Sequence, residues 1–125
     1  MRIDQHSQNA AIILRPHGTM DSLVYTQFMS MINQINDPNC ETVLIDLIDV
    51  YLVDSIMLSG FTQSFRRLNA KGISMALANP QPYVLELLNL VKIQRVIPVY
   101  ASLDEALCAG HCSAPSPINQ EPSQA

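Results

Sequence analysis

A serine at the junction of two sequence patterns is the residue of this chain best placed for chemistry. A nearly continuous apolar run, from Thr42 to Val53, ends at Asp54, and apolar residues at helical spacing begin directly after Ser55. The patterns predict a hydroxyl at the carboxyl end of a strand and the amino end of a helix. Free backbone N–H groups and the helix dipole stabilise phosphate-sized anions there. Ser55 is therefore the first candidate for an active position.

The residues alone leave two other interpretations of Ser55 open. As a helix N-cap, its hydroxyl would accept a hydrogen bond from a first-turn N–H and contribute about 1 kcal/mol, a role compatible with modification. As the nucleophile of a small hydrolase, it lacks the glycines of a nucleophile elbow, because Val53-Asp54 precede it and Ile56-Met57 follow it. The sequence disfavours the hydrolase.

Three aspartates near the same strand suggest a phospho-accepting receiver domain. They are Asp46, Asp49 and Asp54. The first predicted strand, however, ends in Leu14-Arg15-Pro16-His17 rather than in the acidic pair that would help to hold Mg²⁺. This interpretation is disfavoured, and Asp46 is expected to be a local hydrogen-bonding residue near the end of its strand.

A metal site is not expected either. Cys108, His111 and Cys112 offer three zinc ligands, but a fourth is missing nearby and the spacing is not the paired form of known zinc motifs. His6 and His17 are expected to be isolated, exposed or turn histidines.

Composition restricts the chain to one domain and to few classes of partner. Its 125 residues, 48% of them apolar, suffice for one core. The net charge is −4, from 11 acidic and 7 scattered basic side chains, which disfavours nucleic-acid binding. No uncharged apolar stretch approaches the roughly 18 residues of a membrane span, and the N-terminus lacks a signal-peptide pattern. Three cysteines without a regular framework suit a reducing compartment, so we expect a cytoplasmic protein.

Strands and helices are predicted to alternate. The patterns predict strands over residues 10–15, 43–47, 73–78 and 96–100, and helices over 22–36, from 55 to a glycine C-cap at 72, over 83–90 and over 102–109. The alternation indicates one layered α/β domain over residues 1–109. Residues 110–125 are rich in Ser, Pro and Gln and are expected to form a disordered tail.

These residues resemble the signature of STAS domains, the family of anti-sigma factor antagonists. The signature lies in Val43 to Leu47, Val50 and Val53-Asp54-Ser55, and the similarity covers about residues 10 to 108. Further matches are Gly18, Asp21, Lys71-Gly72, Leu77 to Pro80, Val96 to Tyr100 and Ser102 to Leu107. The resemblance implies a single STAS-like α/β domain, with a small mixed sheet of about four to five strands packed with about four helices, and no cofactor.

The resemblance also implies a bacterial signalling role without catalysis. In that family the serine after the aspartate accepts a phosphate from a partner kinase that is also an anti-sigma factor. Only the unphosphorylated antagonist binds that partner and frees the sigma factor, and a serine phosphatase is a further expected partner. By position, Ser55 would be the acceptor, Asp54 its acidic neighbour, and Asp21 and Asn79 part of the partner-binding surface.

One departure from the family pattern concerns the first turn after Ser55. Where the family commonly has a small residue and a glycine, this chain has Ile56 and Met57. These side chains would hinder a kinase or would form an apolar docking patch, to which Tyr51 and Leu52 would contribute. They favour the alternative, a constitutive STAS interaction module of a transporter or signalling assembly that is not phosphorylated.

Overall fold

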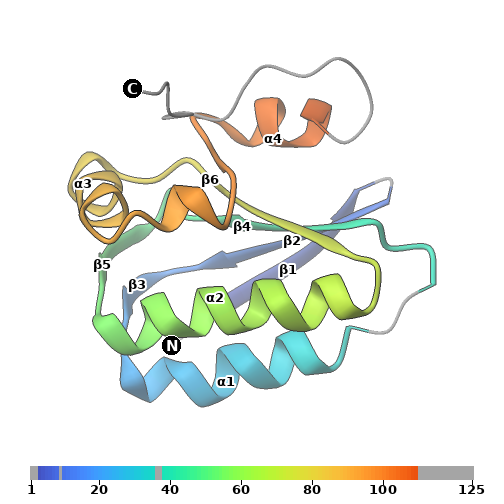
Figure 1. The fold of residues 1–125 in the computed structure, drawn as a ribbon, viewed down its shortest axis with the longest axis horizontal. Coiled ribbons are helices and arrows are strands. Elements are labelled where there is room, and N and C mark those ends of the chain that lie inside the picture. The colour runs from blue at the N-terminus through green and yellow to red at the C-terminus, as the bar shows by residue number, and fades with distance from the viewer. Residues whose placement is uncertain (1–2, 9, 36–37, 110–125) are drawn as a thin grey trace.

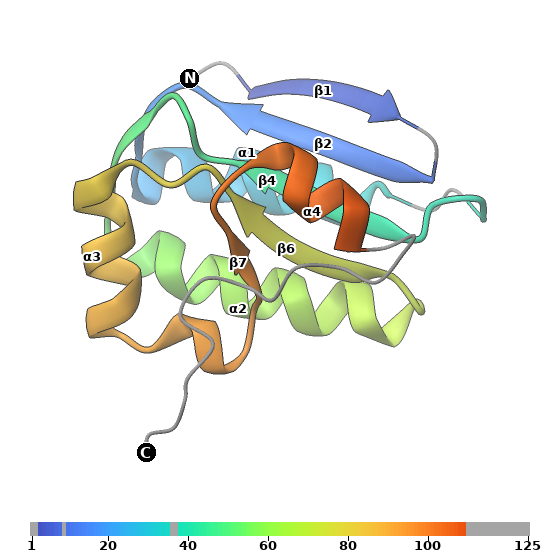
Figure 2. The ribbon, with the colours of Figure 1, turned by 90° about the horizontal axis from the view of Figure 1, so that it is seen from above.

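A five-stranded mixed sheet lies between helices on both of its faces (Figure 1). The computed structural model describes residues 3–8, 10–35 and 38–109. The strand order is β1-β2-β4-β6-β7; β1 is antiparallel to β2, and the other neighbours are parallel. Helices α1 and α2 cover one face, α4 covers part of the other, and α3 lies at one end (Figures 1 and 2). This arrangement confirms the predicted α/β class.

The elements alternate along the chain much as the patterns predict. The strands are β1 (Ile3–Gln8), β2 (Ala11–Pro16), β3 (Gly18–Met20), β4 (Thr42–Asp46), β5 (Val50–Val53), β6 (Ser74–Ala78) and β7 (Val99–Tyr100). The helices are α1 (Ser22–Asn33), α2 (Ser55–Ala70), α3 (Pro82–Leu90) and α4 (Leu103–Ala109), with a 3-10 turn over Ile93–Arg95. The predicted tail, residues 110–125, lies outside the described residues, as do the side chains of Cys108, His111 and Cys112. No described helix combines the length and apolar character that crossing a membrane requires.

Burial on both faces explains the apolar central strands. In β4, Val43 and Ile45 belong to the large core beneath α1 and α2, whereas Leu44 belongs to a small core beneath α4. In the large core, Phe28 of α1 and Phe61 of α2 meet edge to face with their ring centroids 5.6 Å apart. A sheet covered by helices on both faces requires such strands to be apolar throughout.

The apolar run from 42 to 53 is two strands rather than one. The chain turns between them because the Asp46 carboxylate accepts a hydrogen bond from the Ile48 N–H at 3.1 Å and the Val50 N–H donates to the Leu47 carbonyl at 3.0 Å. The second strand, β5, leaves the main sheet and pairs in parallel with β3 as a separate two-stranded sheet. Neither of these short strands is predicted by the sequence pattern.

The predicted ending of α2 is confirmed. Gly72 has φ +80°, its N–H donates to the Asn69 carbonyl at 2.9 Å, and the Ile73 N–H donates to the Leu68 carbonyl at 2.9 Å. These two bonds satisfy carbonyls that the last helical turn leaves open, in the manner of a glycine-terminated helix. Together with its start at Ser55, they make α2 the best-predicted element of the chain.

Candidate functional site

The aspartate before Ser55 caps helix α2. Its Oδ1 accepts a hydrogen bond from the Met57 N–H at 3.0 Å, and its backbone is extended, as an N-cap requires. Ser55 is the first helical residue, so the interpretation of Ser55 as the N-cap is wrong. Aspartate is a strong capping residue, and its negative charge suits the positive end of the helix dipole.

A second, similar cap lies beside the first. The Asp21 Oδ1 accepts from the Leu23 N–H at 3.0 Å at the start of α1, and the Asp54 Oδ2 accepts from the Ser22 N–H at 3.2 Å. The two helices begin together because β3 and β5 are parallel neighbours that end together, with Met20 opposite Val53. The sequence analysis predicted that Asp21 lies near Ser55. The bond from the Ser22 N–H to Asp54 joins the start of α1 to the start of α2, where these two residues stand.

The Ser55 hydroxyl faces solvent between these caps. Its residue is exposed, and within the described part of the chain it makes no side-chain hydrogen bond. Its neighbours Asp21 and Asp54 have no ion pair with a described basic side chain. A hydroxyl at this exposed position is reachable by another protein, and it lies at a helix start that an aspartate caps.

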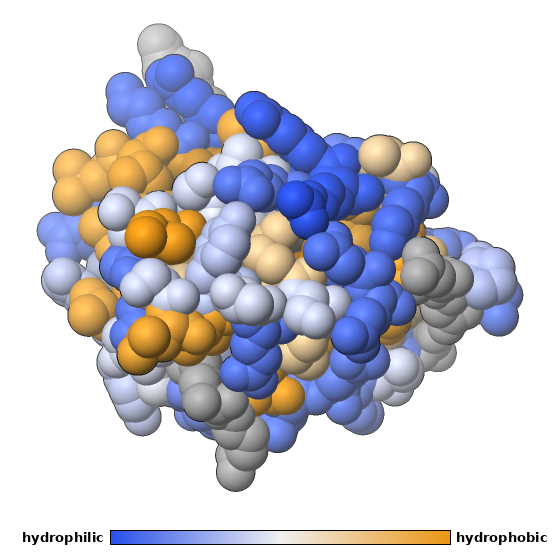
Figure 3. Space-filling view, turned by 90° about the horizontal axis from the view of Figure 1, so that it is seen from below, coloured by the Kyte–Doolittle hydropathy of each residue, from blue (hydrophilic) through white to orange (hydrophobic). Residues whose placement is uncertain are grey.

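Exposed apolar side chains occur on the elements that meet at this junction. Leu23 of α1 is 88% exposed and Ile56 of α2 is 47% exposed, while Tyr51 and Leu52 of β5 are 66% and 40% exposed. Figure 3 shows hydrophobic surface gathered toward the end where α1 and α2 begin, and mainly hydrophilic surface toward their C-terminal ends. We call Leu23, Tyr51, Leu52 and Ile56 the apolar rim.

Met57 does not belong to this surface. Its side chain is fully buried in the large core, so its predicted contact with a partner is a correction to the sequence interpretation. The helical spacing accounts for this, because Met57 shares an inward face with Phe61 whereas Ile56 points outward.

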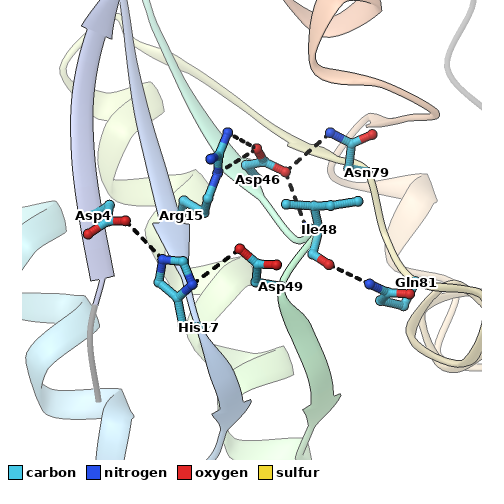
Figure 4. A network of polar contacts seen from close by, with 8 residues as sticks. All are labelled: Asp4, Arg15, His17, Asp46, Ile48, Asp49, Asn79 and Gln81. Atoms are coloured by element: carbon cyan, nitrogen blue, oxygen red, sulfur yellow. Dashed lines mark hydrogen bonds and ion pairs between the residues drawn. The ribbon is translucent and has the colours of Figure 1, made fainter.

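Asn79 is engaged in a different network, centred on a buried aspartate (Figure 4). Its Nδ2 donates to the Asp46 Oδ1 at 3.2 Å, and Arg15 binds the other oxygen of Asp46 through Nε at 3.0 Å and Nη2 at 2.9 Å. Asp46 is 1% exposed, so the guanidinium compensates a carboxylate that is removed from water. Asp46 is a hydrogen-bonding residue at the strand end, as predicted.

His17 lies in the connection between β2 and β3, as a turn histidine would, but it is not isolated, and that part of the prediction is wrong. Its Nε2 lies 2.9 Å from the Asp4 Oδ2, and its Nδ1 lies 3.2 Å from the Asp49 Oδ2 (Figure 4). The imidazole therefore joins β1 to the turn between β4 and β5. Since Asp46, Asp49 and Asp54 each contact different groups, they do not form the shared acidic pocket of a receiver domain. The described residues contain no group of three His, Cys, Asp or Glu side chains that could hold a metal ion.

Comparison with known proteins identifies the family. The model of the STAS domain matches residues 2–106. The chain belongs to the STAS domain family. It is 25% identical over 108 residues to the anti-sigma F factor antagonist of Paenibacillus polymyxa, with 86% of this chain and 92% of that protein covered.

Solved structures share the fold of this STAS domain. An anti-sigma factor antagonist from Mycobacterium paratuberculosis superposes with a TM-score of 0.78 at 18% identity, covering 86% of this chain and 92% of that one. The STAS domain of a SulP transporter from Vibrio cholerae superposes with a TM-score of 0.67 at 16% identity, covering 84% and 83%. The same fold is thus found in an antagonist and in a transporter domain.

Two residues of this STAS domain's polar surface escaped the sequence interpretation. Ser22 occupies the first position of α1 behind an aspartate cap, as Ser55 does in α2. The repeated pattern, Asp-Ser followed by two apolar residues at 21–24 and 54–57, is the signal that would have found it. No comparable local signal marks His17, because its two partners are distant in the sequence.

Proposed function

We propose that this STAS protein is an anti-sigma factor antagonist that binds an anti-sigma factor with serine kinase activity and is switched off by phosphorylation of Ser55. The observation that carries the proposal is the division of roles at the start of α2: Asp54 caps the helix, and the exposed Ser55 hydroxyl is left for modification. The similarity to an antagonist from Paenibacillus polymyxa supports it. Such a protein acts in the bacterial cytoplasm, and a serine phosphatase would reverse the switch.

Phosphorylation is expected to leave the fold nearly unchanged. A phosphoserine carries about −1.5 to −2 charges at neutral pH. The amino end of α2 favours this charge by about 0.3–1 kcal/mol at an exposed position. The carboxylates of Asp54 and Asp21 oppose it through repulsion that water screens. The opposing effects are similar in size, so a switch cannot depend on unfolding.

The effect on a bound partner is much larger. A partner that covers Ser55 also covers parts of the apolar rim, such as Leu23 and Ile56. A phosphate enclosed there without a paired cation costs several kcal/mol of desolvation. Each 1.4 kcal/mol, roughly, weakens binding tenfold, so one phosphate suffices to dissociate the complex. The kinase would supply the ATP, the metal and the base of the transfer.

The test is phosphorylation in vitro by the kinase encoded in the same cell, with labelled ATP. We expect the wild-type protein and Ser22→Ala to take up label and Ser55→Ala to take up none. Ser22→Ala is a matched control, because this serine also follows a capping aspartate at an exposed helix start. Equal labelling of the wild type and Ser55→Ala would overturn the acceptor assignment. Mass spectrometry of the protein from its native cell checks the same residue.

The second candidate is a constitutive STAS interaction module. The half-exposed Ile56 directly beside Ser55 favours it, since a bulky side chain there obstructs the close approach of a kinase. The likeness to a SulP transporter domain shows that the fold occurs in such assemblies. A pull-down with Ser55→Asp and Ser55→Ala separates the two: the antagonist loses its partner only in Ser55→Asp, and the constitutive module keeps its partner in both.

A further inference from the structure

We propose that strand β1 is a self-association edge, which pairs antiparallel with β1 of a second copy and joins the two sheets into one. The strand lies at the end of the sheet, outside β2 (Figure 2). Among the described strands only β2 pairs with it. This inference is independent of the role of Ser55, which lies at the start of α2.

The exposure of β1 is unusual for a regular strand. Five of its six residues are exposed, so both faces as well as the outer edge meet solvent, and Ile3 alone packs partly against the large core. The strand has no apolar face that would fix it on the domain. A strand of this kind gains stability chiefly from pairing, and a second ladder on its outer side would add to the first.

The edge has few of the devices that usually prevent such pairing, and Asp4 is its one fully charged side chain. β1 contains no Pro and no Lys, and its register with β2 runs unbroken from Ile3 opposite Pro16 to Gln8 opposite Ala11, without a bulge. At the other end of the sheet, β7 has only two residues. Within the described part of the chain, no second strand pairs with the regular and polar outer edge of β1, so this edge is available for strand addition.

The side chains of β1 favour a second copy as the occupant. Asp4 and His6 lie on the same face, where both line a hollow beside Arg15 and Leu103. In the antiparallel register centred on Gln5, each Asp4 stands opposite the second copy's His6, and the two Gln5 side chains stand opposite each other. The His6 imidazole can donate a hydrogen bond to the facing Asp4 carboxylate, which also contacts His17 through Oδ2 at 2.9 Å, whereas two like charges directly opposite each other are unfavourable. A two-fold axis makes this pairing twice, as an isologous contact requires.

A concentration series tests the proposal. Pairing of a single strand forms a small contact, typical of weak complexes, so sedimentation equilibrium should extend to millimolar protein. We expect a reversible dimer of the wild type. His6→Lys should keep the dissociation constant within about twofold, whereas His6→Asp, which faces Asp4 twice, should raise it about 5- to 30-fold. A wild type that stays monomeric throughout would overturn the proposal.

Cross-linking tests the register in a background with Cys108→Ser and Cys112→Ser. Gln5→Cys should form a disulfide-linked dimer under mild oxidation, because the two residues face each other across the axis. Ser7→Cys, exposed on the same face, should not, because it stands opposite Ile3. Circular dichroism confirms that both variants are folded. Equal cross-linking of the two variants would reject the pairing through β1 centred on Gln5. A protein that dimerises while neither variant cross-links would reject it as well.

Discussion

Asp54 and Ser55 divide two tasks that a sequence pattern tends to assign to one residue. Both stand at the junction of strand and helix, and both have oxygen atoms that can accept from a first-turn N–H. The longer aspartate side chain makes the cap and also binds the Ser22 N–H, which joins the starts of two helices. The serine is thereby spared a structural role, and a modification of its hydroxyl need not disturb the helix.

Substitution of the two residues should therefore have unequal effects on stability. Asp54→Ala removes the cap and the bond to Ser22, and we expect the free energy of unfolding to fall by about 1–2 kcal/mol. Ser55→Ala removes an exposed hydroxyl without a described partner, and we expect a change within about 0.5 kcal/mol. Urea unfolding followed by circular dichroism measures both. A loss of stability beyond that range in Ser55→Ala would show that the serine side chain contributes to the cap of α2.

The ion pair between the half-exposed Arg15 and the buried Asp46 offers a second prediction. Arg15→Met should destabilise the protein by about 1–3 kcal/mol, because it leaves the Asp46 carboxylate buried without its cation. In Arg15→Met/Asp46→Asn that charge is gone as well, so the loss should be smaller than the sum of the single losses. A double-mutant cycle of urea unfolding gives the coupling energy, and strictly additive losses would contradict the pairing.

Helices α1 and α2 approach each other closely at one glycine. A Cβ atom at Gly60 would lie 3.1 and 3.2 Å from carbons of the Tyr25 ring. That ring is held in place, since the Tyr25 hydroxyl donates to the Gln63 Oε1 at 3.1 Å. The contact explains a glycine inside a long helix, where it otherwise costs stability relative to alanine.

A branched side chain at this position should force the helices apart. We expect Gly60→Val to lower the free energy of unfolding by about 1–3 kcal/mol through overpacking against Tyr25. Arg66→Val places the same side chain on an exposed position of α2 and should change stability by less than about 0.5 kcal/mol. Thermal unfolding of the pair is the measurement, and equal melting temperatures would show that the contact is not tight.

The helices were predictable because their apolar residues recur at helical spacing, and the central strands because each is a short, nearly continuous apolar run. The sequence patterns did not predict three of the strands, β1, β3 and β5, because none of them has a clear apolar pattern of its own. β1 is exposed on nearly all sides and has no apolar period, while β3 and β5 are short and exist through their mutual pairing. Pairing between distant segments leaves little mark in local sequence, whereas burial of a helix face leaves a strong one.

Across the molecule, the sheet separates a large core from a small one. The small core beneath α4 contains few large side chains, and Tyr100 of β7 is one of them. Burial raises the pKa of the Tyr100 phenol above its ordinary value near 10. The unfolded chain therefore loses this proton at lower pH than the folded one does, and the stability of the fold declines as the pH rises past that ordinary value.

Tyr100→Phe should weaken this alkaline loss of stability. The phenylalanine cannot ionise, so the free energy of unfolding should fall less from pH 9 to pH 11, approximately the range of tyrosine ionisation, than it does in the wild type. Tyr51→Phe, at an exposed tyrosine, should follow the wild-type curve. Urea unfolding at several pH values provides the comparison, and identical curves for Tyr100→Phe and the wild type would refute the contribution of Tyr100.

Local patterns were enough to predict the start and end of α2, the buried central strands and the position of Ser55, because capping, helical spacing and short apolar runs all depend on near neighbours. Tertiary structure alone decided that Asn79 serves Asp46, that His17 joins Asp4 to Asp49, and that Ser22 lies beside Asp54. These contacts depend on which strands lie side by side, and that choice arises from the packing of the whole domain rather than from any short stretch of the chain.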